Sequence, residues 1–162
     1  MALQKVLLDV GLLKCPKFYL DVRFIAAILS GVVALWFIYD WVPVFSSSIQ
    51  FHWGLFISVL IWQPFIEELL FRGIIQGQLS KYKWGQKNLL RITSANVVVS
   101  VLFVGLHTLT NPPLWAISIV VPSIVFGYFR DTFKSVYPSI ILHSAYNAIA
   151  LAGLFIHGNL II

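Results

Sequence analysis

The chain has 162 residues, of which 59% are hydrophobic and 10% are charged, whereas a soluble domain is about 45–50% apolar and about 25% charged. This composition excludes an ordinary soluble domain and predicts an integral membrane protein. The net charge of +5 does not indicate a nucleic-acid partner, because the basic residues lie in short segments between apolar runs. The only cysteine, Cys15, cannot form an internal disulfide.

Residues 1–14 have apolar side chains at helical spacing, interrupted by Lys5, Asp9 and Lys14. A secretory signal needs a continuous apolar core and a cleavage site of small residues, which this segment lacks. We therefore expect an N-terminal interfacial helix. A frayed terminus is the alternative.

Five apolar runs follow, and we expect each of them to cross the bilayer, which takes about 20 residues of helix. They cover approximately Phe24–Trp41, Phe51–Leu79, Ser94–Leu109, Leu114–Phe129 and Val136–Ile156. No internal repeat or linker divides the chain. The sequence thus predicts one all-α domain over residues 1–162, a polytopic transmembrane helical bundle of about five spans.

Lysine and arginine are distributed unevenly among the segments that join these runs. They lie before the first run, between the second and third, and between the fourth and fifth, whereas loops 42–50 and 110–113 have none. Basic loops remain on the cytoplasmic side of a membrane. We therefore expect a multi-pass protein of the cell membrane with its N-terminus in the cytoplasm and its C-terminus outside.

The second run contains three charged residues, Glu67, Glu68 and Arg72. Ionisable groups at membrane depth cost about 2.5–3.5 kcal/mol each on insertion scales, so they persist mainly where they are paired and functional. Glu68 and Arg72 are four residues apart and can pair on one helix face, whereas Glu67 points about 100° away and has no such partner. Pro64 lies in the same run and is expected to kink the helix just before Glu67.

Two other runs also contain polar residues. His107 lies in the third run, and His143 and Asn147 lie four residues apart in the fifth, on one helix face. At about 1.5 Å per residue from the expected cytoplasmic helix ends, Glu67 lies roughly 18 Å deep, His107 roughly 20 Å, Asn147 roughly 16 Å and His143 and Arg72 roughly 10 Å. These groups can therefore meet in one layer.

This set of groups is suited to hydrolysis of a carbonyl compound. The unpaired carboxylate of Glu67 can take a proton from water. Two histidines and an amide can orient that water and stabilise an oxyanion. Gln63, one turn before Glu67, and Ser100, two turns before His107, are expected to line the cavity.

Three motifs resemble those of a known family. Residues 67–73 resemble the EExxxR motif, residues 103–107 the FxxxH motif and residues 143–147 the HxxxN motif of the CAAX protease and bacteriocin-processing family of intramembrane glutamic endopeptidases, whose bacterial members are often labelled abortive-infection proteins. One such pattern alone is weak evidence. Three in this order, each on a separate apolar run, are specific.

The resemblance implies a role for each residue. The residues matching Glu67 and His107 activate the hydrolytic water, and those matching His143 and Asn147 support the site and stabilise the oxyanion. The residues matching Glu68 and Arg72 support the motif or help to position substrate.

The resemblance also implies the class of enzyme and substrate. We expect an intramembrane endopeptidase with a catalytic core over about residues 51–157. Its partners are expected to be the lipid bilayer and a membrane-anchored protein or peptide precursor, which it cuts near a terminus.

Two alternatives remain open. Glu67, His107 and His143 also form the one-carboxylate, two-histidine ligand set of a catalytic zinc site, with Glu68 as the base. The compact H-E-x-x-H motif is missing, and the resemblance to a family of glutamic peptidases implies a metal-independent site, so we expect no metal cofactor, with zinc as the second choice. The other alternative is a non-catalytic membrane protein that binds a peptide, as an immunity protein does.

Overall fold

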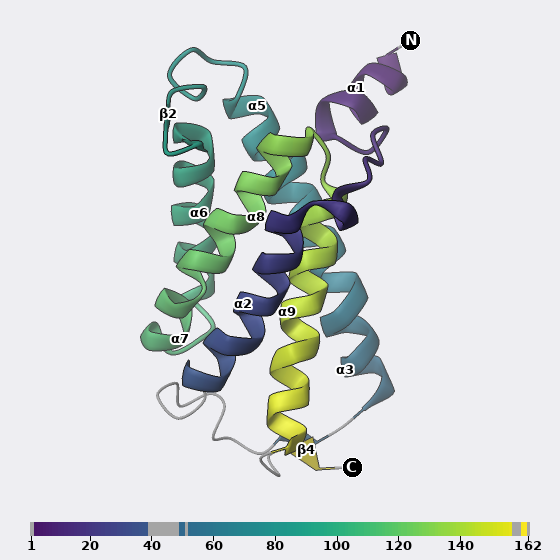
Figure 1. Ribbon diagram of the computed structural model, residues 1–162, viewed down its shortest axis with the longest axis vertical. Helices are drawn as coiled ribbons and strands as arrows, with labels where there is room; N and C mark the ends of the chain where they lie inside the picture. The colour runs from purple at the N-terminus through teal and green to yellow at the C-terminus, as the bar shows by residue number, and fades with distance from the viewer. Residues whose placement is uncertain (1, 39–48, 51, 157–159, 162) are drawn as a thin grey trace.

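The computed structural model describes residues 2–38, 49–50, 52–156 and 160–161. Within these ranges the chain forms a helical bundle with the N-terminus at one end and the C-terminus at the other (Figure 1). The predicted all-α, polytopic class is therefore confirmed.

The first helix is α1 (Ala2–Val10), which a short 3₁₀ turn, η1 (Phe18–Leu20), separates from α2 (Val22–Ile38). The later helices are α6 (Ser94–His107), α7 (Pro113–Ser118), α8 (Val120–Phe133) and α9 (Tyr137–Ile156). Two short strand pairs join loops: β1 (Ile49–Gln50) lies parallel to β4 (Leu160–Ile161), and β2 (Asn88–Leu89) lies antiparallel to β3 (Ile92–Thr93).

Between β1 and β2 the chain forms one long helix, here called the second span, over Trp53–Leu79. It consists of α3 (Trp53–Ile57), η3 (Ser58–Trp62), α4 (Gln63–Glu68), η4 (Leu69–Gln76) and α5 (Gly77–Leu79). Segments η3 and η4 are π-helical, with backbone hydrogen bonds from residue i+5 to residue i. Pro64 has no N–H to donate to a preceding carbonyl, and η3 lies directly before α4, which contains it. The kink expected just before Glu67 stays a prediction. The second π-helical segment, after the acidic pair, was not expected.

Among the described residues, three helical stretches are long and apolar enough to cross a membrane: the second span, Pro113–Phe133 and Tyr137–Ile156. The remaining expected spans correspond to shorter apolar helices. The third ends at His107, two residues earlier than expected, and its 14 residues extend about 21 Å at 1.5 Å per residue. This is less than the hydrocarbon core of about 30 Å. The end expected for the first span, at Trp41, lies outside the described residues.

Helix α9 packs against α2, α8 and α4, and α6 packs against α8 and η4. An apolar cluster joins η1, α2, α8 and α9 and consists of Phe18, Phe24, Phe126, Phe129 and Leu142. A second apolar cluster, Phe71, Val99 and Phe103, joins the second span to α6. These contacts bring the second span, α6 and α9 together, the three parts of the bundle that carry the predicted site residues.

The expected N-terminal helix is present as α1 and packs on one end of the bundle against η4 and α5. The Lys81 ammonium donates to the Asp9 carboxylate at 2.7 Å, and Arg130 donates to the Asp9 carbonyl at 3.3 Å. The hydrogen bond from Lys81 holds the pKa of the Asp9 carboxyl below its usual range. Leu3 and Val6 of α1 remain exposed, as an interfacial helix requires.

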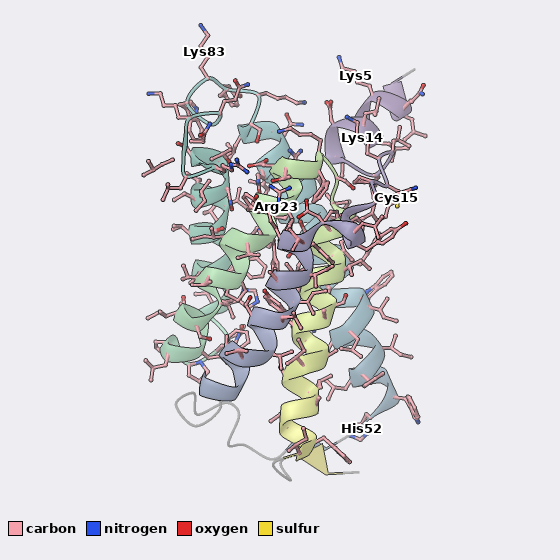
Figure 2. All side chains as sticks on the ribbon, viewed as in Figure 1. Lys5, Lys14, Cys15, Arg23, His52 and Lys83 are labelled. Atoms are coloured by element: carbon pink, nitrogen blue, oxygen red, sulfur yellow. The ribbon has the colours of Figure 1, made fainter. Side chains whose placement is uncertain are left out.

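Basic residues gather at the end of the bundle where α1 lies. Figure 2 shows Lys5, Lys14 and Lys83 there, and His52 at the opposite end. This distribution is the one that the expected topology requires. The orientation in the membrane itself remains a prediction.

Candidate active site

Glu67, His107 and His143 meet in the interior although they come from three helices. Glu67 lies near the end of α4, His107 is the last residue of α6, and His143 lies in the first half of α9. The Nε2 atoms of His107 and His143 are each 4.0 Å from Oε2 of Glu67. These separations are too long for direct hydrogen bonds, but an oxygen atom about 2.8 Å from both atoms of either pair can bridge that pair. The geometry therefore suits a water molecule between the carboxylate and an imidazole.

The His107 ring is oriented by its own helix. Its Nδ1 lies 2.8 Å from the carbonyl oxygen of Phe103, which can only accept a hydrogen bond. Nδ1 is therefore the protonated nitrogen of the neutral ring, and Nε2 presents a lone pair toward Glu67. The rings of Phe103 and Trp115 lie against the imidazole, with centroids 4.4 and 5.6 Å away.

His143 is held by the other glutamate. Its Nδ1 lies 3.0 Å from Oε1 of Glu68, and its ring stacks on Phe126 at 5.0 Å with an interplanar angle of 17°. Oε2 of Glu68 lies 3.4 Å from Nε of Arg72, and neither side chain has exposed surface. The predicted Glu68–Arg72 pair is thus confirmed. The bond from Glu68 to His143 was not predicted, since sequence does not reveal which faces of two helices meet.

The Arg72 guanidinium is fixed by α8 and by two aromatic rings. Nη2 donates to the backbone carbonyl and to the hydroxyl of Ser123, at 3.1 and 2.9 Å. The guanidinium carbon lies 5.1 Å from the ring centroid of Phe103 and 5.9 Å from that of Phe126, within the range of cation–π attraction. Sequence analysis missed Ser123 and Phe126 because no motif contains them. A serine within an apolar run was the available signal for Ser123.

Asn147 links α9 to the second span. Its amide nitrogen donates to the carbonyl oxygen of Val59, in η3, at 2.8 Å. Asn147 and Gln63 both line the cavity described below, as expected for Gln63. The expectation for Ser100 was wrong: Ser100 is not among the lining residues and instead donates to Asn96 at 3.1 Å, buried within α6.

A cavity of about 800 Å³ opens beside these groups. Helices α2, α6, α7, α8 and α9 and the second span all contribute to its mainly apolar wall, and Glu67, His107 and His143 are among its few ionisable lining residues. A smaller cavity of about 240 Å³ is lined by Glu67, Phe71, Leu106, His107 and Thr110. Glu67 and His107 therefore lie where the two cavities adjoin.

A comparison with family models identifies the chain. The model for type II CAAX prenyl endopeptidase Rce1-like proteins matches residues 48–149, well over half of the sequence. The chain belongs to the Rce1-like family. No curated protein and no solved structure matches it.

The Rce1-like match confirms the predicted family and the membrane-protease class of the chain. The matched residues begin at position 48 and include the second span, α6, α8 and the first part of α9, and so all six predicted site residues. Helices α1 and α2 precede the match. The Rce1-like chain is accordingly a membrane-embedded protease of the hydrolase class, built from apolar helices.

Glu67, His107 and His143 are also the residues of this Rce1-like site that could hold a metal ion. Their Nε2–Oε2 separations of 4.0 Å exceed the roughly 3.4 Å between two ligand atoms on one tetrahedral zinc ion. Within the described part of the chain, no group of three His, Cys, Asp or Glu residues has a metal-binding arrangement. A zinc ion would require the three side chains to move closer together.

Proposed function

We propose that the chain is a glutamic intramembrane endopeptidase in which Glu67 activates the hydrolytic water. The observation that carries this proposal is the convergence of two imidazole Nε2 atoms on one oxygen of Glu67, each at 4.0 Å. A water molecule bound there can donate one hydrogen bond to the carboxylate, to which it later gives that proton, and a second hydrogen bond to Nε2 of His107, while keeping the second hydrogen. Its oxygen lone pair is then free to attack a peptide carbonyl.

The reaction follows from this arrangement. Glu67 takes a proton from water, and the resulting hydroxide adds to the carbonyl carbon of the substrate to form a tetrahedral oxyanion. Collapse of that intermediate breaks the C–N bond, and Glu67 returns its proton to the departing nitrogen. One peptide and one water thus become a carboxylic acid and an amine, and Glu67 is regenerated.

His143 and Asn147 supply the hydrogen-bond donors for the oxyanion in this proposal. The carboxylate of Glu68 accepts from His143 Nδ1 and stabilises a positively charged imidazole ring, whose Nε2–H then faces the reacting centre. The Asn147 amide has two N–H groups, and only one is needed for its bond to Val59. Arg72 acts as a positioning residue because it holds Glu68.

The substrate proposed is a membrane-anchored protein or peptide precursor cut near a terminus. The apolar wall of the large cavity supports a substrate segment with apolar side chains. The basic end of the bundle supports a topology with the N-terminus in the cytoplasm and the C-terminus outside.

The test is a comparison of membrane peptides, by mass spectrometry, from cells that produce the unsubstituted protein or the Glu67→Gln variant. Glutamine retains the shape of the side chain but cannot take the proton. We expect specific cleavage products to disappear in the variant while the purified variant elutes and unfolds like the parent. Identical peptide profiles would instead favour the non-catalytic peptide-binding protein.

A zinc peptidase is the second candidate, because the same convergence offers one carboxylate and two imidazoles as ligands. It needs another group as the base, and Glu68 is directed at His143 and Arg72 rather than at the cavity. We propose the metal-independent mechanism for this reason. Activity should survive chelation, and a loss that added zinc reverses would make zinc the better assignment.

A further inference from the structure

A polar stripe follows the second span away from the catalytic groups. Glu68, Arg72, Gln76 and Ser80 recur every four residues and so lie along one side of the helix. The first three have no exposed surface. Arg72 and Gln76 donate to α8 at Ser123 and Gly127, two positions that are also four residues apart. The stripe is therefore packed in register against α8, inside the bundle.

Every member of the stripe has a buried polar atom that lacks a hydrogen-bond partner. Among the described residues, the buried side-chain atoms in this condition are Glu68 Oε2, Arg72 Nε and Nη1, Gln76 Oε1 and Ser80 Oγ. All five belong to the stripe. Glu68 Oε2 and Arg72 Nε face each other as an ion pair at 3.4 Å, which leaves Arg72 Nη1, Gln76 Oε1 and Ser80 Oγ without any partner in the ranges that the structure describes. Buried polar atoms in native proteins are nearly always hydrogen-bonded, so three exceptions in one row require an explanation.

Ordered water is the partner that fits these atoms. The unpaired Nη1 of Arg72 is a donor and the unpaired Oε1 of Gln76, one turn along the stripe, is an acceptor, so one water molecule can accept from the first and donate to the second. The Ser80 hydroxyl can do both. Buried water of this kind, with two to four polar partners, is a regular part of protein structures.

We propose that the stripe binds a file of ordered water that leads from Ser80, next to the loop at Lys81, to the Glu68–Arg72 pair behind the catalytic groups. This path is separate from the substrate cavity, because none of the four stripe residues lines that cavity. Water can thus reach the catalytic layer from the basic end while a peptide fills the cavity. That last consequence rests on the proposed function, whereas the hydrated path itself does not.

Thiol accessibility tests the path without any substrate. Cys15, the only cysteine, is first replaced by serine, and single cysteines are then introduced as Gln76→Cys in the stripe, Ala150→Cys in the cavity wall and Val99→Cys in the dry apolar cluster. The probes are the silver ion, which is small enough for a water file, and a bulky cationic methanethiosulfonate, which is not.

We expect silver to modify the cysteines at positions 76 and 150 at least about tenfold faster than the one at position 99, because only wetted thiols ionise and react readily. The bulky reagent should modify position 150 alone. Reaction at position 76 as slow as at position 99 would overturn the water file, and reaction there with the bulky reagent would show that the path is part of the cavity. Ser80→Cys repeats the test if Gln76→Cys does not fold.

The unsubstituted protein provides a second measurement. A crystallographic map that resolves ordered water should show density within hydrogen-bond distance of both Arg72 Nη1 and Gln76 Oε1. A direct bond between these two side chains, with no density between them, would overturn the proposal. Either negative result leaves the peptide comparison for Glu67→Gln unaffected, so the two proposals fail separately.

Discussion

Removal of the buried Arg72 charge should destabilise the protein more than removal of both members of its ion pair. Arg72→Met leaves the Glu68 carboxylate in the interior with His143 as its partner, since neither side chain of the pair is exposed. Removing one member of a buried pair costs about 3–5 kcal/mol. The lost donor to the Ser123 hydroxyl adds about 1 kcal/mol. We therefore expect Arg72→Met to lower the free energy of unfolding by about 4–6 kcal/mol.

The double variant Arg72→Met/Glu68→Leu removes both charges from the interior. Replacement of a buried pair by apolar residues is often neutral or stabilising by about 1–4 kcal/mol. The hydrogen bonds that Ser123 and His143 lose cost about 1–3 kcal/mol each when the remaining groups are buried. The central values are a gain of about 2.5 kcal/mol and a loss of about 4 kcal/mol, so we expect the double variant to be about 1.5 kcal/mol less stable than the unsubstituted protein.

Unfolding in detergent with increasing mole fraction of sodium dodecyl sulfate measures both variants, with the fluorescence of the six tryptophans as the signal. The double variant should regain most of the lost stability and yet cleave no peptide, because His143 has lost the carboxylate that holds it. A double variant as unstable as Arg72→Met, or one that still cleaves, would refute the role assigned to Glu68.

Three further predictions follow from other contacts. A Cβ at Gly127 would collide with a side-chain amide of α6, so Gly127→Ala should cost about 1–3 kcal/mol. The control is Gly105→Ala, because nothing lies within 4 Å of a Cβ at that position, and it should be neutral or stabilising by up to about 1 kcal/mol. Equal unfolding temperatures for the two variants would contradict the close packing at Gly127. The hydrogen bond from Lys81 lowers the pKa of the Asp9 carboxyl from 3.8. The pair therefore stabilises the packing of α1 on the bundle above pH 3.8, and this contribution is lost as the pH falls through the lowered pKa. The rate of amide hydrogen exchange in α1 should therefore rise below about pH 4 relative to that of an Asp9→Asn control at the same pH. The same pH dependence of the exchange rate in both proteins would contradict this prediction. Asn147→Ala leaves a partly buried backbone carbonyl of η3 without the side-chain donor of Asn147 and should lower the free energy of unfolding by about 1 kcal/mol in the detergent assay. An unchanged free energy would show that this hydrogen bond contributes nothing to stability.

Features that depend on one helix were predictable from sequence. The pair Glu68–Arg72 follows from a spacing of four residues, and the separation of Glu67 from it follows from the helical angle. Both are present. The position of a helix before the first apolar run also follows from local pattern alone.

Features that depend on how helices align were less predictable. The depth count puts Glu67 roughly 18 Å and His143 roughly 10 Å from the expected cytoplasmic helix ends, yet their side chains lie 4.0 Å apart. The count assumes that all helices begin at one level, whereas α5 extends beyond the start of α9 (Figure 1). The residues between Glu67 and the end of the second span at Leu79 include the π-helical segment η4, in which each residue advances less along the axis than in the α-helix that the count assumes. The bond from Glu68 to His143 could not be predicted either, because sequence does not reveal which faces of two helices meet.

The central claim is that Glu67, and not Glu68, activates the water. The most direct test compares the rate at which one identified cleavage product forms in the Glu67→Gln and Glu68→Gln variants. Loss of the general base should slow the Glu67→Gln variant by about 10²–10⁴-fold. The Glu68→Gln variant should retain part of the activity, because the glutamine oxygen can still accept from His143 Nδ1. Retained cleavage in Glu67→Gln, with complete loss in Glu68→Gln, would contradict the account.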